Sequence, residues 1–292
     1  MMANIPPIKV AVASGKGGTG KTTIATSLAL SLSQNISDSI LFLDCDVEAP
    51  NAHLFLRPQF EAERPVEILI PEVDEAACTH CGKCAEVCQF QAIAVLGKKT
   101  LVFPQLCHGC GSCTLVCPTQ AIHEVPKQIG ILQQGTSANM RFARGVMNIG
   151  EPMAVPIIRQ LKKWVSPLKP QVTIVDSPPG TSCPVVESIR SNNFLILVTE
   201  PTPFGLHDLR LAYSVAQDLQ IPAGVVINRD NGAFKELEDF CESENIPILM
   251  RIPFQREIAE GISQGKNLIE VLPDMKENFL QSFETIKKMV KK

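Results

Sequence analysis

The sequence predicts an α/β protein with a doubly wound, mostly parallel sheet that is interrupted by a small α+β insert. Three observations support this fold class. Short apolar runs alternate with helix-like segments, a glycine-rich loop follows the first run, and eight cysteines with a repeated spacing lie between residues 74 and 124. Alternating strands and helices build parallel sheets that helices cover on both faces. We expect residues 1–73 and 125–292 to form one discontinuous domain and residues 74–124 to form the insert.

The glycine-rich loop lies between a predicted strand, Ile8–Ala13, and a predicted helix, Ile24–Ser33. It comprises Ser14, Gly15, Lys16, Gly17, Gly18, Thr19, Gly20, Lys21, Thr22 and Thr23, and it matches the pattern G-x-x-x-x-G-K-[ST]. Backbone N–H groups of such a loop converge on phosphate oxygens, and the following helix N-terminus adds partial positive charge. In this pattern Lys21 reaches the β- and γ-phosphates and the Thr22 hydroxyl ligates Mg²⁺. The loop therefore predicts a site for ATP and Mg²⁺.

Carboxylates follow two later strands. Ser39–Leu43 leads into Asp44 and Asp46, and Val172–Val175 leads into Asp176 of the segment D-S-P-P-G. In a doubly wound sheet the carboxyl ends of the strands border the ligand crevice, so we expect these carboxylates near the nucleotide. The alternative for Asp44 and Asp46 is a turn-forming or helix-capping role.

The remaining elements follow from the same apolar pattern. We expect further strands at 194–199, 223–227 and 246–250, and helices at 157–165 and 206–219. Residues 133–156 are rich in Gly, Asn and Met and predict a long irregular, partner-facing loop, in which Arg141 and Arg144 meet phosphate, an acidic partner or solvent. The tail from Leu272 to Lys292 predicts a helix packed on the sheet, with membrane contact as the alternative.

The loop, with a second lysine at Lys16, resembles the deviant P-loop of the MinD/ParA/Mrp family of dimeric ATPases, to which the nitrogenase iron protein belongs. The resemblance implies a sandwich dimer, of like subunits or with a paralogue, in which Lys16 crosses to the partner's nucleotide. It also implies that Asp46 positions the attacking water and that Asp44 supports Mg²⁺. The catalytic residues expected on this basis are Lys16, Lys21 and Asp46.

The same resemblance assigns three further nucleotide contacts. Asp176 would contact Mg²⁺ through water, and the Gly180 N–H would sense the γ-phosphate. Asn228, after the strand at 223–227, would contact the adenine, and residues 252–254 would flank the purine. The resemblance makes the segment from Asp176 to Gly180 the second switch of the family. Cys183, seven residues beyond Asp176, resembles in position a cluster ligand of the nitrogenase iron protein; a small packed residue is the default expectation.

Eight of the eleven cysteines form two copies of C-x₂-C-x₂-C-x₃-C. Residues 78–95 and 107–124 share nine of 18 identities, which indicates an internal duplication. The spacing is that of a bacterial two-cluster ferredoxin, in which the fourth cysteine of each copy ligates the other cluster. One [4Fe–4S] cluster is therefore expected on Cys78, Cys81, Cys84 and Cys117, and the other on Cys107, Cys110, Cys113 and Cys88. The alternative is a pair of zinc sites; His80 and His108 are expected to be exposed loop residues.

Composition limits the function classes. The net charge of −3 argues against nucleic-acid binding, and no apolar run is long enough to span a membrane. Residues 1–7 lack the pattern of a signal peptide, and thiolate ligands fit a cytoplasmic protein better than disulfides do. We expect an ATPase whose dimer switching gates electron transfer through two clusters to a partner protein. The alternative is an iron–sulfur or metallocofactor assembly carrier; a MinD-like positioning ATPase leaves the insert unexplained.

Overall fold

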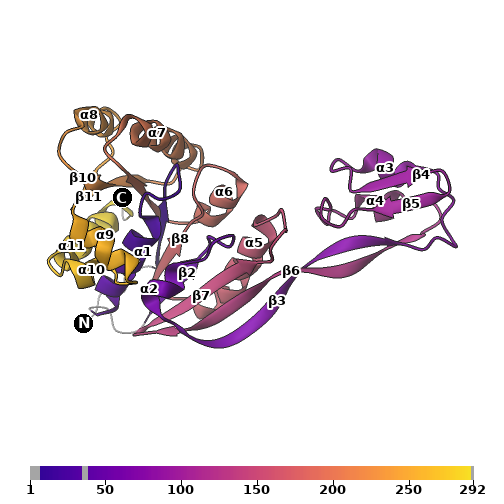
Figure 1. The fold of residues 1–292 in the computed structure, drawn as a ribbon, viewed down its shortest axis with the longest axis horizontal. Coiled ribbons are helices and arrows are strands. Elements are labelled where there is room, and N and C mark those ends of the chain that lie inside the picture. The colour runs from indigo at the N-terminus through magenta and orange to yellow at the C-terminus, as the bar shows by residue number, and fades with distance from the viewer. Residues whose placement is uncertain (1–6, 35–38, 291–292) are drawn as a thin grey trace.

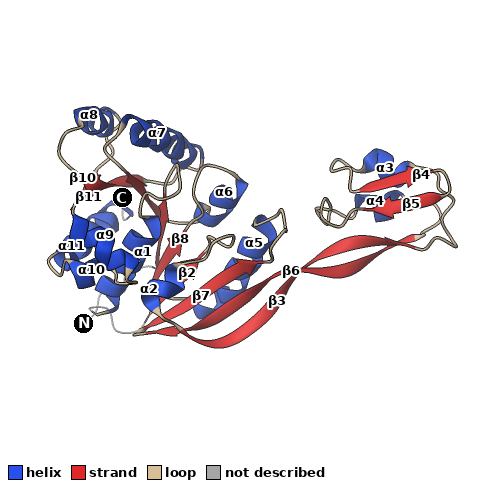
Figure 2. Ribbon diagram, viewed as in Figure 1, coloured by secondary structure: helices blue, strands red, loops and turns tan. Residues whose placement is uncertain are grey.

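The computed structural model describes residues 7–34 and 39–290, so the predictions for residues 1–6 and for the lysines at 291–292 lie outside the described residues. Its body is built on one nine-stranded sheet with the strand order β11-β10-β9-β1-β8-β2-β7-β6-β3 (Figure 2). The strands from β11 to β7 are parallel to one another, and β6 and β3 are added to that edge in antiparallel fashion. The strands are β1 Ile8–Ala13, β2 Ile40–Asp44, β3 Gln59–Val73, β6 Ile122–Ser137, β7 Met140–Met147, β8 Val172–Asp176, β9 Phe194–Thr199, β10 Ala223–Asp230 and β11 Ile248–Pro253.

Helices cover both faces of this sheet, which confirms the predicted α/β class (Figure 1). They are α1 Lys21–Ser33, α2 Ala52–Leu56, α5 Val155–Val165, α6 Cys183–Ile189, α7 Pro203–Asp218, α8 Lys235–Ser243, α9 Arg256–Ser263, α10 Leu268–Val271 and α11 Met275–Val290, with a 3₁₀ turn at Ser166–Leu168. Apolar side chains of α1 and α11 pack on one face, and those of α5, α6, α7 and α8 pack on the other. Phe279, Phe283 and Ile286 of α11 are buried, which confirms that the tail helix packs on the sheet.

The predicted irregular loop at 133–156 is wrong. Its first part is strand, because β6 runs to Ser137, a two-residue turn follows, and β7 begins at Met140. The glycines here permit close strand packing: a Cβ on Gly135 would lie 2.0 Å from the Gln59 carbonyl oxygen. The arginines of β7 make contacts within the sheet, since Arg141 pairs with Glu61 at 3.1 Å and Arg144 lies over the Phe60 ring.

The two longest strands leave the body as a two-stranded ribbon. Residues 122–129 of β6 lie beyond the last β7 pair, Gly130 with Met147, and residues 122–128 pair with β3 alone. At the tip of the ribbon, residues 74–121 form a separate small unit, here called the cysteine unit (Figure 1). It contains α3 Lys83–Val87, the hairpin of β4 Ile93–Leu96 and β5 Lys99–Val102, and α4 Ser112–Val116.

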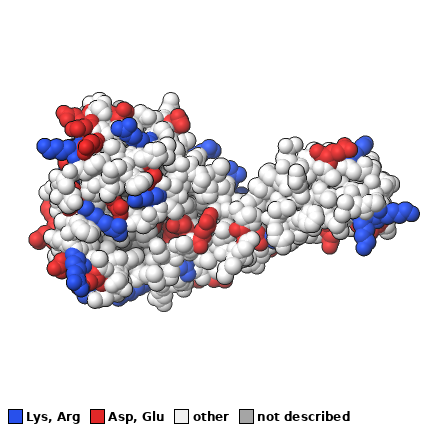
Figure 3. All heavy atoms as spheres, turned by 45° about the horizontal axis from the view of Figure 1, so that its top comes forward, with Lys and Arg blue, Asp and Glu red and all other residues white. Residues whose placement is uncertain are grey.

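The cysteine unit has a very small apolar core, in which the buried Cys84 and Ile93 pack with Ile122, the first residue of β6. In the space-filling view its visible face is mostly uncharged, with basic side chains gathered at the far end (Figure 3). A core of this size contributes little burial energy, so the unit depends on other interactions for its stability. Within the described residues, no helix has the length and apolar character needed to cross a membrane.

Candidate functional site

The predicted phosphate-binding loop lines a cavity of about 490 Å³ beyond the carboxyl end of β1. Of the predicted nucleotide residues, this cavity brings together Gly17, Gly18, Gly20, Lys21, Thr22, Thr23, Asp46 and Asn228. Its opposite wall includes Ile252, Pro253 and Phe254, the segment expected to flank a purine. The remaining predicted residues, Gly15, Lys16, Thr19, Asp44, Asp176 and Gly180, lie outside this lining. The cavity is large enough for a small-molecule ligand.

Close packing explains two glycines of the loop. A Cβ on Gly15 would lie 2.2 Å from the Asp208 carbonyl oxygen. Gly20 has φ +94°, and a Cβ there would lie 2.4 Å from the Asn228 amide nitrogen. That amide donates a 2.7 Å hydrogen bond to the Thr19 carbonyl, so in this structure Asn228 holds the loop. Helix α1 begins at Lys21, three residues before the predicted start, which directs its N-terminus toward the cavity.

Two buried carboxyls lie side by side behind the loop. Asp44 of β2 and Asp176 of β8 are register partners, and both side chains are fully buried. Burial raises the pKa of Asp176 to about 7, while burial and the Asp176 charge raise the pKa of Asp44 well above its usual value. Burial lowers the pKa of Lys21, and the charges of Asp176 and Asp46 oppose that shift.

The hydrogen bonds of these carboxyls distinguish their roles. Thr22 donates a 2.6 Å hydrogen bond to Oδ2 of Asp176, whereas Oδ1 of Asp176 is buried and has no partner within residues 7–34 and 39–290. Asp44 accepts from the backbone N–H groups of Asp46 and Ala52, as the turn-forming alternative predicts. A buried carboxylate oxygen without a donor, beside a threonine hydroxyl, is a donor set suited to a hard divalent cation such as Mg²⁺.

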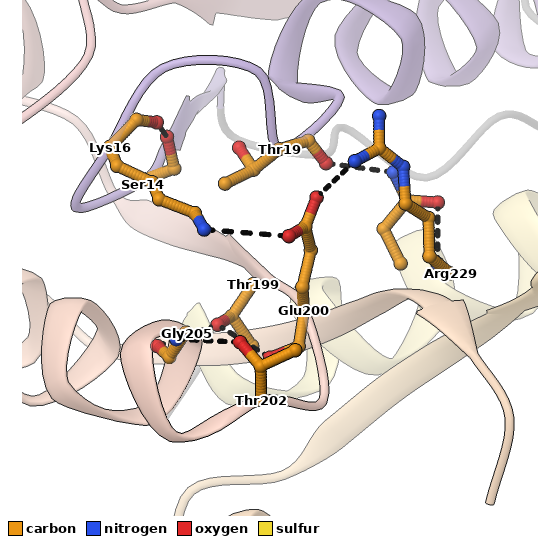
Figure 4. A network of polar contacts seen from close by, with 9 residues as sticks. Ser14, Lys16, Thr19, Thr199, Glu200, Thr202, Gly205 and Arg229 are labelled. Atoms are coloured by element: carbon orange, nitrogen blue, oxygen red, sulfur yellow. Dashed lines mark hydrogen bonds and ion pairs between the residues drawn. The ribbon is translucent and has the colours of Figure 1, made fainter.

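Lys16 belongs to an ionic network that the sequence patterns do not reveal (Figure 4). Its Nζ lies 3.4 Å from Oε2 of Glu200, and Nη1 of Arg229 lies 2.6 Å from Oε1 of the same carboxylate. Glu200 follows β9, and Arg229 follows Asn228 on β10, so this carboxylate joins the loop to the wall beside the predicted adenine contact. In the sequence, the only indication of this network is that Glu200 and Arg229 follow predicted apolar strands. In this structure Lys16 is bound within its own chain.

Two further predicted residues, Asp46 and Gly180, lie near the phosphate-binding loop. Asp46 is partly buried, and burial raises its pKa while the Lys21 charge lowers it. Gly180 has φ +93°, and its N–H donates a 2.9 Å hydrogen bond to the Ser14 carbonyl, which links the D-S-P-P-G segment to the loop.

The cysteine unit contains two cavities, each lined by four cysteines. One set is Cys78, Cys81, Cys84 and Cys117, and the other is Cys88, Cys107, Cys110 and Cys113. Each set takes three cysteines from one copy of the repeat and the fourth from the other copy. The fourth cysteines accept backbone hydrogen bonds at sulfur, from Ala92 to Cys88 at 3.2 Å and from Ala121 to Cys117 at 3.3 Å. All eleven cysteines of the chain are free.

No group of three or more His, Cys, Asp or Glu residues suited to one metal ion occurs in the described part of the chain. A single ion requires its ligand atoms to converge on one centre. In a four-iron cubane each thiolate binds a different iron, so its ligands surround a larger volume.

Three smaller expectations need correction or comment. His80 is half-buried instead of exposed, with Nδ1 3.2 Å from the Thr100 hydroxyl and 3.6 Å from the Cys78 sulfur. His108 is exposed, as expected, and stacks on Phe90. The expectation of a packed Cys183 is wrong: it is the first residue of α6 and is exposed.

The sheet, the loop and its helix together define a P-loop nucleotide-binding protein. The chain belongs to the CobQ/CobB/MinD/ParA nucleotide binding domain family, whose sequence profile matches residues 10–269. Membership of this superfamily, in which MinD and ParA are ATPases, confirms the resemblance drawn from the loop.

Individual relatives agree with this assignment. Uncharacterized protein MJ0578 of Methanocaldococcus jannaschii is 31% identical over 97% of this chain and 98% of its own length. The cytosolic Fe-S cluster assembly factor NUBP1 homolog of Caenorhabditis briggsae is 24% identical over 96% of this chain and 80% of its own length. The septum site-determining protein MinD from Pyrococcus horikoshii, solved with Mg-ADP, has a TM-score of 0.59 and 19% identity, covering 97% of both chains. This last similarity shows a shared fold.

Proposed function

We propose that this chain hydrolyses Mg–ATP as a dimer and that its nucleotide state gates electron transfer from two [4Fe–4S] clusters in the cysteine unit to a partner protein. The observation that carries the proposal is the crossed pair of four-cysteine cavities at the tip of a ribbon that continues the nucleotide-binding sheet. A cytoplasmic setting fits a chain with free cysteines.

The nucleotide chemistry follows from the placement of the loop residues. Lys21 neutralises phosphate charge, the Thr22 hydroxyl and Asp176 hold Mg²⁺, and Asp46 orients the attacking water. Mg²⁺ supplies charge neutralisation at the β- and γ-phosphates when bound. The unpartnered Oδ1 of Asp176 supports this assignment, because a cation or its water would give that buried oxygen a partner. Lys16 must leave Glu200 before it can reach a partner's nucleotide.

The cysteine unit fits two cubanes by three features. Each cavity has four thiols, each set crosses between the two repeats, and backbone N–H groups point at sulfur, as they do toward thiolates. The clusters supply one-electron chemistry when bound. The rest of the unit positions the ligands and leaves Cys81 and Cys110 exposed, one in each set.

A chain of contacts links the segment around Asp46, here called the first switch, to the cavity lined by Cys88, Cys107, Cys110 and Cys113. The N–H of Met147, at the end of β7, donates a 2.9 Å hydrogen bond to the carbonyl of Val47, the residue after Asp46. Beyond β7, Glu151 pairs with Lys127 of the ribbon at 2.8 Å.

Lys127 completes the path into the cysteine unit. Its Nζ donates a 3.3 Å hydrogen bond to the Pro104 carbonyl, which also accepts the N–H of Cys107. Movement of the switch around Asp46 can therefore reach a cysteine of the cavity through packed and hydrogen-bonded groups, which is the physical requirement for coupling.

The test compares cluster reduction potentials in the ADP and ATP-analogue states of anaerobically purified protein. A coupling free energy of about 1–3 kcal/mol corresponds to a difference of about 40–130 mV for a one-electron couple. Lys127→Met should reduce this difference while iron content and nucleotide affinity stay the same. The control is Lys99→Met, which replaces an exposed lysine of the cysteine unit. Equal wild-type potentials in both states would refute gating of the potential, and a difference that survives Lys127→Met would refute this path.

The second candidate function is an iron–sulfur cluster or metallocofactor assembly carrier. The specific observation in its favour is the relative named as a cytosolic Fe-S cluster assembly factor. A carrier must lose iron and sulfide to an apo-acceptor protein in an ATP-dependent manner. Protein that keeps all of its iron through repeated ATP turnover in the presence of an apo-acceptor would exclude this candidate.

A further inference from the structure

A cavity of about 350 Å³ extends from the amino-terminal end of β1, at Lys9, along one face of β2 and β8 as far as Leu43 and Val175, and it shares no lining residue with the nucleotide cavity. Its apolar wall is formed by Leu41, Leu43, Val165 and Val175. Its size falls within the range of small-molecule sites in proteins. Nothing in the proposed ATPase or cluster chemistry uses it.

Four cations line this cavity and no carboxylate does. They are Lys9, Lys162, Lys169 and Arg190. Within residues 7–34 and 39–290, none of the four forms an ion pair. Uncompensated positive charge beside an apolar wall favours a ligand that is both anionic and apolar.

Lys162 is fixed in place. Its Nζ donates to the carbonyls of Glu187, Ser188 and Arg190 at 2.8, 3.2 and 2.8 Å, at the end of α6. Burial lowers the pKa of Lys162; the nearby Glu187 charge opposes this shift, and the charges of Lys9 and Arg190 add to it. Lys162 therefore contributes a fixed charge, while Lys9, Lys169 and Arg190 remain free to contact a ligand.

Lys9 is unusual for its position. It lies on β1, a central strand whose other residues are all buried, and it is exposed. Its neighbours across the sheet are Thr173 of β8 and, beyond it, Leu41 of β2, and both line the same cavity. Residues opposite one another in adjacent strands share a face, so Lys9 and Leu41 of the apolar wall lie on the same face of the sheet.

We propose that this cavity binds a small amphiphilic carboxylate, with its apolar chain on the leucine and valine wall and its carboxylate between Lys9, Lys169 and Arg190. The three strands of its floor, β1, β2 and β8, end in the phosphate loop, Asp44 and Asp176, respectively. Lys9 is about 17 Å along β1 from the loop, at the usual rise per strand residue. Binding on these strands is therefore expected to change nucleotide affinity at their carboxyl ends, and the effect is reciprocal.

The test is calorimetric titration of decanoate into the full-length protein purified anaerobically, with 1-decanol as an uncharged probe of equal chain length. Saturable 1:1 binding of decanoate and no comparable binding of decanol are expected. Lys9→Met and Lys169→Met should each weaken decanoate binding about tenfold, because each removes a charged contact. Lys163→Met, which lies next to Lys162 on α5 and outside the lining, should leave binding unchanged.

The outcomes separate the parts of the proposal. Absence of saturable decanoate binding, or equal binding of decanol, overturns the anion site. Equal weakening by Lys163→Met overturns its location. Saturating decanoate should change ADP affinity about fivefold, a typical coupling, and an unchanged ADP affinity overturns the link to the nucleotide site.

Discussion

The buried pair of carboxyls behind the phosphate loop predicts that Asp176→Asn stabilises the nucleotide-free protein at alkaline pH. The pKa of Asp176 is raised from 3.8 to about 7, chiefly by burial. Between these values the folded state holds a proton that the unfolded chain has lost, so the free energy of unfolding falls as the pH rises. The asparagine side chain can still accept the Thr22 hydrogen bond and carries no charge to bury.

The size of the pKa shift of Asp176 sets the magnitude of the expected stability difference. The raised pKa of Asp176 lowers the free energy of unfolding by about 4.3 kcal/mol at pH 8 and by about 1.7 kcal/mol at pH 5, relative to a side chain that does not titrate. The stability advantage of the asparagine variant should therefore grow by about 3 kcal/mol between pH 5 and pH 8. Removal of the Asp176 charge also relieves Asp44, whose pKa that charge helps to raise, so both effects have the same sign.

Urea unfolding followed by the fluorescence of Trp164 provides the assay, in EDTA and without nucleotide. Trp164 is the single tryptophan and lies on α5 in the body, so the signal reports the ATPase fold. Asp239→Asn, an exposed side chain on α8, is the control and should show the same stability difference at both pH values. An Asp176→Asn difference that does not change with pH would refute the reasoning, and the same variant should lose Mg²⁺-dependent ATP hydrolysis.

Three further predictions concern the loop and the cysteine unit. Lys21→Ala should weaken ATP binding about 10- to 100-fold, since it removes a charge-assisted contact to phosphate; equilibrium dialysis measures this. Cys88→Ser and Cys117→Ser should each remove half of the bound iron. The Cys117 variant should keep the cluster that has Cys107, Cys110 and Cys113 as ligands, and the Cys88 variant should keep the other cluster, as site-specific EPR spectra can show. Gly15→Ala should lower the melting temperature by several degrees, about 1–3 kcal/mol, because its Cβ meets the backbone of Asp208, and scanning calorimetry provides the check.

The sequence predicted most reliably those features that depend on local spacing. The strand–loop–helix at residues 8–33 and the crossed cysteine sets depend on short, ordered patterns, and the structure brings each set of side chains to one cavity. Features that depend on distant partners were missed. The Lys16–Glu200–Arg229 network joins three separate segments, so no periodicity in any one of them indicates it.

The error at residues 133–156 has a related cause. The glycines and polar side chains of β6 and β7 are typical of loops when only the local sequence is considered. Gly135 is required by the approach of Gln59, and the polar side chains pair across the sheet, as Thr136 does with Glu61 at 2.8 Å. Such reasons for a residue type become visible only when the neighbouring strand is known.

The length of the ribbon matters to any gating mechanism. Residues 122–129 extend about 26 Å beyond the last pairing with β7, so a tilt of about 5° at the body would displace the cysteine unit by about 2 Å. An isolated two-stranded ribbon is only marginally stable, but this one continues into a nine-stranded sheet, which fixes its base and register. Because β7 is hydrogen-bonded to Val47 beside the first switch, a small nucleotide-dependent change can reorient the unit without altering the surroundings of either cysteine set. The nucleotide state can therefore affect partner docking and cluster reduction potential separately. An effect on docking requires an intact ribbon, and an effect on the reduction potential also requires the contact of Lys127 with the cysteine unit.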